Sequence, residues 1–155
     1  SASALNIVGY VVPGGPTYPI FDDVIKWSGW IGGGWGGNYD GANGSPVKRG
    51  TASLRISYVG QWGVPLQLGG ANISLAPYST FTLAIYGGTG SNGKTINIGF
   101  NEADGKTVTI VEGAWTVFDI PLSQIPSDGT LRYLYLKNYS PPGDYTIYVD
   151  DMGLN

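Results

Sequence analysis

Cysteine and histidine are both absent from the 155-residue sequence. Without cysteine the chain has no disulfide framework, no thiolate metal site and no thiol nucleophile. Without histidine it has no His-dependent serine triad, and it lacks the side chain that most often serves acid–base catalysis near neutral pH. Composition alone therefore excludes several common classes of catalytic and metal-binding site.

Charge is scarce as well. Only 12% of residues are charged, with 8 basic against 11 acidic side chains and a net charge of −3. The basic residues are not gathered into the patch that nucleic acid or an anionic membrane surface requires. No apolar run reaches the roughly 18 residues needed to span a bilayer. We therefore expect neither a nucleic-acid partner nor a membrane partner.

Strand signals dominate what is present. Residues 52–58 alternate between apolar side chains on one face and polar side chains on the other, as a half-buried strand does. Further candidate strands cover residues 64–68, 81–85, 96–100, 107–111, 116–120, 131–137 and 145–151. The one candidate helix, 22–30, is short and runs into glycine. The pattern predicts an all-β protein, a β-sandwich of jelly-roll type with two antiparallel sheets.

A single domain is expected. Residues 1–19 are interpreted as a linker remnant or an N-terminal edge extension, and residues 20–155 as the module itself. The glycine run 32–37 lacks the lysine-serine ending of a phosphate-binding loop, and we predict that it forms a surface loop. Trp35 lies in the middle of this run without apolar neighbours, so it is expected to be exposed.

Aromatic residues are crowded into the first half of the chain. Trp27, Trp30 and Trp35 fall within nine positions, and Trp62 lies between two predicted strands. The flat C–H faces of sugar rings pack on aromatic rings, and their hydroxyls need neutral donors and acceptors. The predicted carbohydrate-binding residues are Trp35, Trp62, Trp30, Trp27, Tyr39, Gln67 and Asn138. Trp115, in an apolar strand, is expected to belong to the core.

Catalysis has few candidates. The chain holds two Glu and nine Asp, and a glycoside hydrolase needs a pair of carboxylates facing each other. Glu102 and Glu112 both flank turns, where exposed acids are ordinary. We therefore predict no catalytic residues. A small jelly-roll glycanase using these two residues stays an alternative, as does an adhesion or interdomain packing module.

Two acidic doublets occur near the ends of the predicted module, Asp22-Asp23 and Asp150-Asp151. If the first and last strands lie side by side, these carboxylates and nearby carbonyls could supply a structural Ca²⁺ site. The alternative is that they are solvated acids at strand ends. The sequence does not decide between the two.

The order of several short motifs resembles bacterial β-jelly-roll carbohydrate-binding modules of plant-cell-wall hydrolases. The resemblance runs from about residue 20 to the C-terminus and rests on Asp22-Asp23, Trp30, Trp35, Asn43, Ser45-Pro46, Gly50, Ser53-Leu54, Tyr58, Trp62-Gly63, Leu66-Gln67-Leu68, residues 115–122 and Tyr148-Val-Asp-Asp151. It departs from the family pattern in the glycine insertion around Trp35 and in Val64-Pro65.

This resemblance implies a secreted, non-catalytic module that is covalently linked to a hydrolase domain. It implies that Trp30, Trp35 and Trp62 occupy the aromatic ligand positions and that Asp150 or Asp151 binds a structural calcium. The expected ligand is a β-1,4-linked glucan such as a cellulose chain, xyloglucan or mixed-linkage β-glucan. We expect a monomer.

Overall fold

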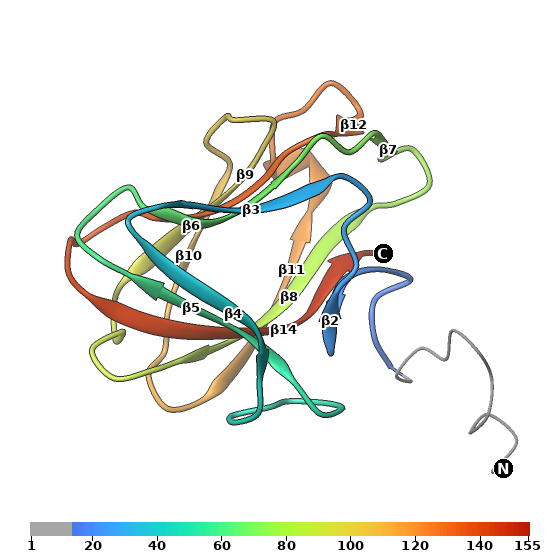
Figure 1. Cartoon of the computed structure of the whole chain (residues 1–155). Helices are drawn as coiled ribbons and strands as arrows, with labels where there is room; N and C mark the ends of the chain where they lie inside the picture. The colour runs from blue at the N-terminus through green and yellow to red at the C-terminus, as the bar shows by residue number, and fades with distance from the viewer. Residues whose placement is uncertain (1–13) are drawn as a thin grey trace, which may run out of the picture.

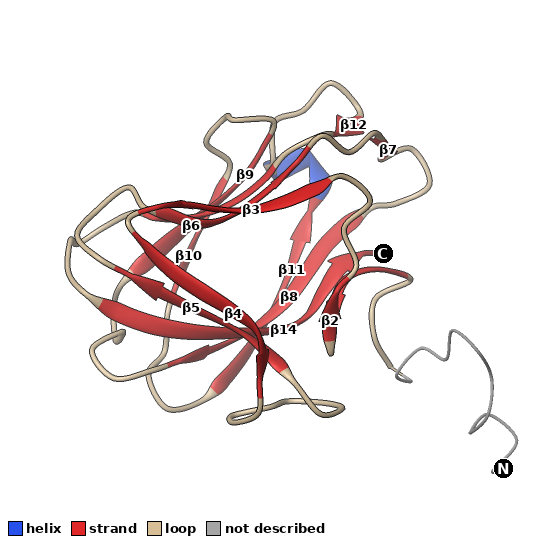
Figure 2. Ribbon diagram, viewed as in Figure 1, coloured by secondary structure: helices blue, strands red, loops and turns tan. Residues whose placement is uncertain are grey.

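A computed structural model describes residues 14–155 as a β-sandwich with one short 3₁₀ turn (Figures 1 and 2). In chain order the elements are β1 (Tyr18–Asp22), β2 (Val24–Ile25), β3 (Trp30–Trp35), β4 (Gly37–Asn43), β5 (Ser53–Tyr58), β6 (Val64–Gly69), β7 (Ile73–Ser74), β8 (Thr80–Gly87), β9 (Thr95–Phe100), β10 (Lys106–Thr109), β11 (Trp115–Pro121), η2 (Leu122–Gln124), β12 (Thr130–Leu131), β13 (Leu134–Asn138) and β14 (Tyr145–Leu154). The predicted all-β class is confirmed.

Two antiparallel sheets form the layers of the sandwich. The seven-stranded sheet has the order β11-β8-β14-β1-β2, and β5 and β4 extend it on the other part of β14. The five-stranded sheet has the order β10-β9-β13-β6-β3, and β7 with β12 forms a separate two-stranded ribbon. Figure 1 shows β3 and β6 of the five-stranded sheet in a different layer from β4, β5 and β14 of the seven-stranded sheet.

The last strand, β14, organises the seven-stranded sheet. Its first half pairs with β5 and its second half with β1, while β8 lies along its other edge. The register shifts between Asp150 and Gly153, and Asp151 has a left-handed φ of 51°. An extra residue of this kind bends a strand locally. The bend lets one strand serve two successive neighbours.

The core lies between the two sheets and comes from the predicted alternation. Along β8, Phe81, Leu83 and Ile85 point inward and are buried. Ile96, Ile98 and Phe100 do the same from β9 in the opposite sheet. The Phe81 and Phe100 rings meet edge to face, with centroids 5.6 Å apart. Apolar burial of this kind supplies the main free energy of folding in a chain without disulfides.

The glycine run was predicted as a loop, and this prediction is wrong. Residues 30–35 form β3, an edge strand paired with β6. A strand needs only its backbone N–H and C=O groups to pair, and glycine retains both. Close packing also favours glycine here, because a Cβ added to Gly34 would collide with the Val64 carbonyl oxygen. The absence of side chains hid this strand from a periodicity argument.

Other boundaries differ by a few residues. The candidate helix 22–30 is not helical and contains the short β2. The segment predicted as one strand, 131–137, is divided between β12 and β13. β1 begins at Tyr18, and the earlier part of the predicted N-terminal segment, 1–13, lies outside the described residues. Within 14–155 no helix has the length and apolarity to cross a membrane.

The contact between Phe81 and Phe100 gives a test of the core. Replacement of the fully buried Phe81 by alanine is expected to lower the free energy of unfolding by about 3 to 5 kcal/mol, because it removes apolar contacts and leaves a cavity. Denaturant unfolding followed by fluorescence measures the change. Val24→Ala is the matched control, since Val24 is 55% exposed and should shift stability by less than about 0.5 kcal/mol. Equal effects of the two variants would contradict this placement of the core.

Candidate functional site

The residues of β13 and those beside it alternate strictly between the core and the outer surface of the five-stranded sheet. Leu134, Leu136 and Asn138 are buried, whereas the residues between them are half-buried. The half-buried set consists of Tyr133, Tyr135, Lys137 and Tyr139. Because β13 lies in the middle of its sheet, this set forms the floor of the outer face.

Each of three exposed tryptophans rests against one of these tyrosines. The centroid distances are 6.0 Å for Trp30 and Tyr133, 6.4 Å for Trp35 and Tyr135, and 5.0 Å for Trp62 and Tyr139, all edge to face. The indoles are 47–49% exposed. Edge-to-face contact fixes a ring while leaving one of its faces free. We call these six residues the Trp–Tyr face.

Trp30 lies against the backbone of the neighbouring strand. A Cβ added to Gly69 would collide with both the Trp30 and the Tyr133 rings. Gly69 pairs directly with Trp30, so its lack of a side chain lets the indole approach the sheet. Gln67, two residues earlier on β6, pairs with Gly32, and among residues 14–155 its amide has no hydrogen-bond partner. A polar amide is therefore available on β6 beside the strand that carries Trp30 and Trp35.

Trp62 lies in the β5–β6 loop and has a left-handed backbone with φ of 65°. That conformation costs a non-glycine residue roughly 1–2 kcal/mol, so the surrounding structure must hold it. Asn138 holds this loop through two hydrogen bonds. Its backbone carbonyl accepts the Trp62 N–H at 2.8 Å, and its side-chain amide donates to the Gly60 carbonyl at 2.7 Å. The Tyr145 hydroxyl donates to the Asn138 side-chain oxygen at 2.8 Å. A buried amide thus positions an exposed indole.

Three further contacts involve residues of the Trp–Tyr face. The Trp35 indole N–H donates to the Trp62 carbonyl at 3.1 Å, so Trp35 presents its ring rather than its donor. The Lys137 ammonium lies 5.9 Å from the Trp62 ring centroid. The Tyr135 hydroxyl donates to Glu102 at 3.2 Å. Burial, reinforced by the Glu102 carboxylate, raises the pKa of Tyr135 to about 12, so this hydroxyl stays protonated at neutral pH.

The structure separates the predicted ligand residues into two groups. Trp30, Trp35, Trp62 and Gln67 lie on or beside the Trp–Tyr face. Trp27 does not, because it is 7% exposed and its indole donates to the Gly69 carbonyl at 2.9 Å inside the core.

Asn138 and Tyr39 are corrections of a similar kind. Asn138 is fully buried and supports the Trp62 loop instead of meeting a ligand. Tyr39 lies on β4 of the other sheet and packs against the core. Trp115 is the reverse case: it was expected in the core and is instead half-buried beside Tyr86. Each error has the same cause: the exposure of an aromatic or amide side chain was predicted only from the residues next to it in the sequence.

The three tyrosines of the Trp–Tyr face were not predicted. The signal was present in residues 133–139, where tyrosine and lysine alternate with leucine and asparagine. Alternation of this type indicates a strand with one apolar face. Aromatic residues at the outward positions indicate a surface that takes part in binding.

The carboxylates of the catalytic alternative are not brought together. Glu102 follows the end of β9 and accepts a hydrogen bond from Tyr135. Glu112 lies beside the loop before β9, where it pairs with Gly87 and accepts the Gly90 N–H at 2.8 Å. The six residues of β9 span roughly 16 Å, whereas glycosidase pairs are separated by roughly 5–9.5 Å. The geometry does not provide the required pair.

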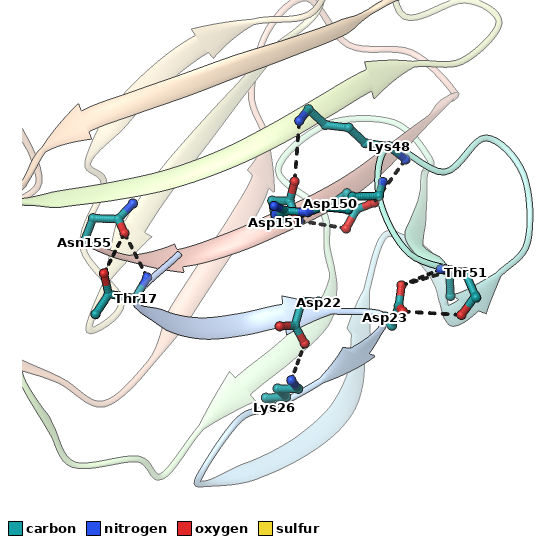
Figure 3. Close-up of polar contacts among 11 residues, drawn as sticks. Thr17, Asp22, Asp23, Lys26, Lys48, Thr51, Asp150, Asp151 and Asn155 are labelled. Carbon is teal, nitrogen blue, oxygen red and sulfur yellow. Dashed lines mark hydrogen bonds and ion pairs between the residues drawn. The ribbon is translucent and has the colours of Figure 1, made fainter. Parts of the chain in front are cut away.

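The acidic doublets hold a loop. Figure 3 shows Asp23, in the bend between β1 and β2, and Asp150 and Asp151, on β14, turned toward the β4–β5 loop, residues 44–52. Asp23 accepts the N–H groups of Thr51 and Ala52 at 2.8 and 3.1 Å. Asp150 accepts those of Lys48 and Arg49, each at 3.1 Å.

Three cations offset part of the negative charge at this site. Asp151 forms ion pairs with Arg49 and, at 3.5 Å, with Lys48. Asp22 forms one with Lys26. Burial raises the pKa of the Asp150 carboxyl, and the Asp151 carboxylate adds to this, while the backbone donors act in the opposite direction.

This arrangement does not fit a shared calcium ion. Residues 14–155 contain no group of three or more acidic or other metal-ligating side chains placed to hold a metal. Calcium needs six to eight oxygen ligands, and here the carboxylates turn toward N–H groups, an ammonium and a guanidinium instead. The geometry of the described residues does not support the predicted role of Asp22, Asp23, Asp150 and Asp151 as calcium ligands.

Comparison with solved structures identifies the fold. The chain is similar to the family 30 carbohydrate-binding module of a cellulosomal cellulase of Clostridium thermocellum, with a TM-score of 0.62, 20% identity, and coverage of 89% of this chain and 96% of that one. It is also similar to a family 11 carbohydrate-binding module of the same organism, in complex with a β-1,3-1,4-mixed-linked tetrasaccharide, with a TM-score of 0.56, 16% identity, and coverage of 86% and 92%. The resemblance to β-jelly-roll carbohydrate-binding modules is thus confirmed for the fold.

The sequence comparisons add nothing to this. No protein-family model matches the chain, and no curated protein does.

The support of Trp62 by Asn138 is testable. Asn138→Ala is expected to lower the free energy of unfolding by about 1 to 3 kcal/mol, because it leaves the buried Tyr145 hydroxyl and Gly60 carbonyl without partners. It should also broaden the Trp62 indole N–H signal in an NMR spectrum. Asn92→Ala, in an exposed turn, is the control and should change neither. An unchanged Trp62 signal in Asn138→Ala would contradict the positioning role.

The acidic loop site gives a second prediction. Because cations already occupy it, EDTA is expected to leave the melting temperature unchanged, and added Ca²⁺ should not raise it, since a ligand that binds only the folded state would stabilise it. Arg49→Gln should lower stability by about 1 to 3 kcal/mol by removing the cation from Asp151. A melting temperature that falls in EDTA and recovers in Ca²⁺ would show instead that calcium binds here.

Proposed function

We propose that this chain is a non-catalytic module that binds polysaccharide on the Trp–Tyr face. The observation that carries the proposal is the set of three half-exposed indoles, each fixed by a tyrosine of the same sheet. Fixed rings lose little conformational entropy when a ligand stacks on them. Exposed indoles would otherwise be an unexplained cost to solubility.

The chemistry of the surface favours a sugar. Aromatic rings pack against sugar C–H groups, and hydroxyls need polar partners close by. Gln67 lies beside β3, which carries Trp30 and Trp35 at its two ends, roughly 16 Å apart along the strand. A ligand that reaches both rings must be several sugar units long, so a polymer fits better than a monosaccharide.

A neutral β-linked glucan suits these features best. In β-glucose all hydroxyls are equatorial, so both ring faces present C–H groups to an aromatic surface. The chain has few charged residues. Lys137, which lies between Tyr135 and Tyr139, forms an ion pair with Asp104. One solved structure of the same fold holds a β-1,3-1,4-mixed-linked tetrasaccharide. We infer that the ligand is a β-1,4-linked or mixed-linkage glucan, such as a cellulose chain or xyloglucan.

The biological setting follows by the same reasoning. The similar structures are carbohydrate-binding modules of cellulosomal cellulases. We propose that this chain is extracellular, monomeric and covalently linked to a hydrolase domain, which it holds close to its substrate. Local concentration of the enzyme is the benefit of such a linkage.

Affinity electrophoresis tests this function. Hydroxyethylcellulose, xyloglucan or mixed-linkage β-glucan in the gel should retard the wild-type chain, whereas Trp35→Ala and Trp62→Ala should each weaken binding roughly 5- to 100-fold, as expected for loss of a central aromatic contact. Val59→Ala is the matched control, because Val59 is an exposed apolar residue of the same loop as Trp62. Unretarded migration of the wild type in all gels would remove the glucan proposal and favour an adhesion role.

A further inference from the structure

A second aromatic cluster lies on the seven-stranded sheet. Trp115 on β11, Tyr86 on β8 and Tyr148 on β14 are direct cross-strand neighbours. Their ring centroids are 5.6 Å apart for Trp115 and Tyr86 and 6.0 Å apart for Tyr86 and Tyr148. We call these three residues the aromatic row.

The aromatic row faces away from the core. On β8 the inward residues are Leu83 and Ile85, so Tyr86 points to the opposite side. On β14, Tyr148 lies between Ile147 and Val149, which are fully buried. All three rings of the row are half-buried, and among residues 14–155 no other element covers this face as a layer. The core therefore does not account for them.

Polar groups lie next to the row. Arg55 on β5 pairs with Tyr148 and donates hydrogen bonds to Asn38 at 2.9 Å and to Ser57 at 2.6 Å. Ser57 also shares a hydrogen bond of 2.9 Å with Thr146. Rings flanked by hydroxyls and an amide repeat the chemistry of the Trp–Tyr face.

A cleft of about 290 Å³ opens at the row. It is lined by Tyr86, Tyr148, Pro46, Glu112 and the adjacent glycines and Thr89. The Glu112 carboxylate uses one oxygen to accept the Gly90 N–H at 2.8 Å, and within residues 14–155 its second oxygen has no partner. Ligand sites are typically concave, rich in aromatic residues and furnished with a few polar groups, and this cleft has each of these properties.

We propose that this cleft is a second carbohydrate site, which takes one end of a neutral oligosaccharide. Tyr86 and Tyr148 contact the sugar ring, Glu112 accepts a hydroxyl hydrogen bond, and Trp115 extends the apolar surface. The carboxylate selects against uronic acids, because two negative charges would approach in a partly desolvated cleft. The cleft is at the small end of the roughly 300–1,000 Å³ range of ligand pockets and fits a sugar end. A protein partner would need roughly 800 Å² of surface per side, far more than the row offers.

This site is independent of the Trp–Tyr face, because the two lie on different sheets. A chain with both sites can hold a polymer on the Trp–Tyr face and a free chain end in the cleft. Glu112, which carries no catalytic partner here, gains a role as a hydrogen-bond acceptor.

Trp115 reports on the proposed site, since it is the one tryptophan of residues 14–155 on this face. In ¹H–¹⁵N NMR spectra, titration with cellotetraose is expected to shift the Trp115 indole N–H signal both in the wild type and in a Trp35→Ala/Trp62→Ala double variant. Tetragalacturonate should not shift it. Failure of the Trp–Tyr face would instead appear as unmoved Trp30, Trp35 and Trp62 signals in the wild type, so the two proposals fail separately.

Variants of the cleft complete the test. Tyr148→Ala should reduce the affinity reported by Trp115 at least fivefold, and Glu112→Gln should allow tetragalacturonate to shift the signal. Val117→Ala is the control, because Val117 is an exposed residue on the same face of β11, two residues beyond Trp115. Glu112 is exposed, so its replacement tests the site even where Tyr148→Ala does not fold. Three results would overturn the proposal. In the first, the Trp115 signal does not shift in millimolar cellotetraose, and in the second it shifts only when the Trp–Tyr face is intact. The third is a shift caused by protein concentration alone.

Discussion

Strict alternation along β13 ties the core of this protein to its outer surface. Leu134 and Leu136 fill the sandwich while Tyr135 and its outward neighbours form the floor of the Trp–Tyr face. Because the side-chain period of a strand is two, a slip of one residue would exchange the two sets completely. The five-stranded sheet therefore cannot bury its leucines without presenting its tyrosines. The tyrosines in turn fix the tryptophans, which come from β3 and from the β5–β6 loop.

Several polar and charged side chains hold loops in place. Asn138 is buried and connects the strand to the loop of Trp62, where it helps to offset an unfavourable left-handed backbone. Asp23 and Asp150 act similarly on the β4–β5 loop through its backbone N–H groups. Charge-assisted hydrogen bonds to backbone are among the stronger ones available to a protein. A chain without disulfides can thus order its loops while three of its tryptophans stay exposed.

Much of the fold was accessible from the sequence, because most of its strands have one apolar face. Residues 53–58 and 95–100 appear where the alternation placed them. The glycine-rich β3 was missed for a physical reason: its pairing with β6 depends on backbone groups and close approach, and neither leaves a side-chain pattern. The site was accessible only in part. Trp30, Trp35 and Trp62 were expected at the surface, but their tyrosine partners lie far away in the chain. Contacts between such distant residues are set by the order of the strands in the sheet.

The sequence by itself determined the fold class, because apolar residues that recur with a period of two between turn signals specify a β-sandwich. Only the tertiary structure decided which aromatic residues are exposed. Trp27 and Trp30 are three residues apart, yet one is a core residue bonded to Gly69 and the other lies on the outer face over that same glycine. Trp115 is the opposite case: it was expected in the core but lies on the outer face of the seven-stranded sheet. The reason is that exposure depends on which strands pair and which loops cross above them, and these contacts join residues far apart in the chain.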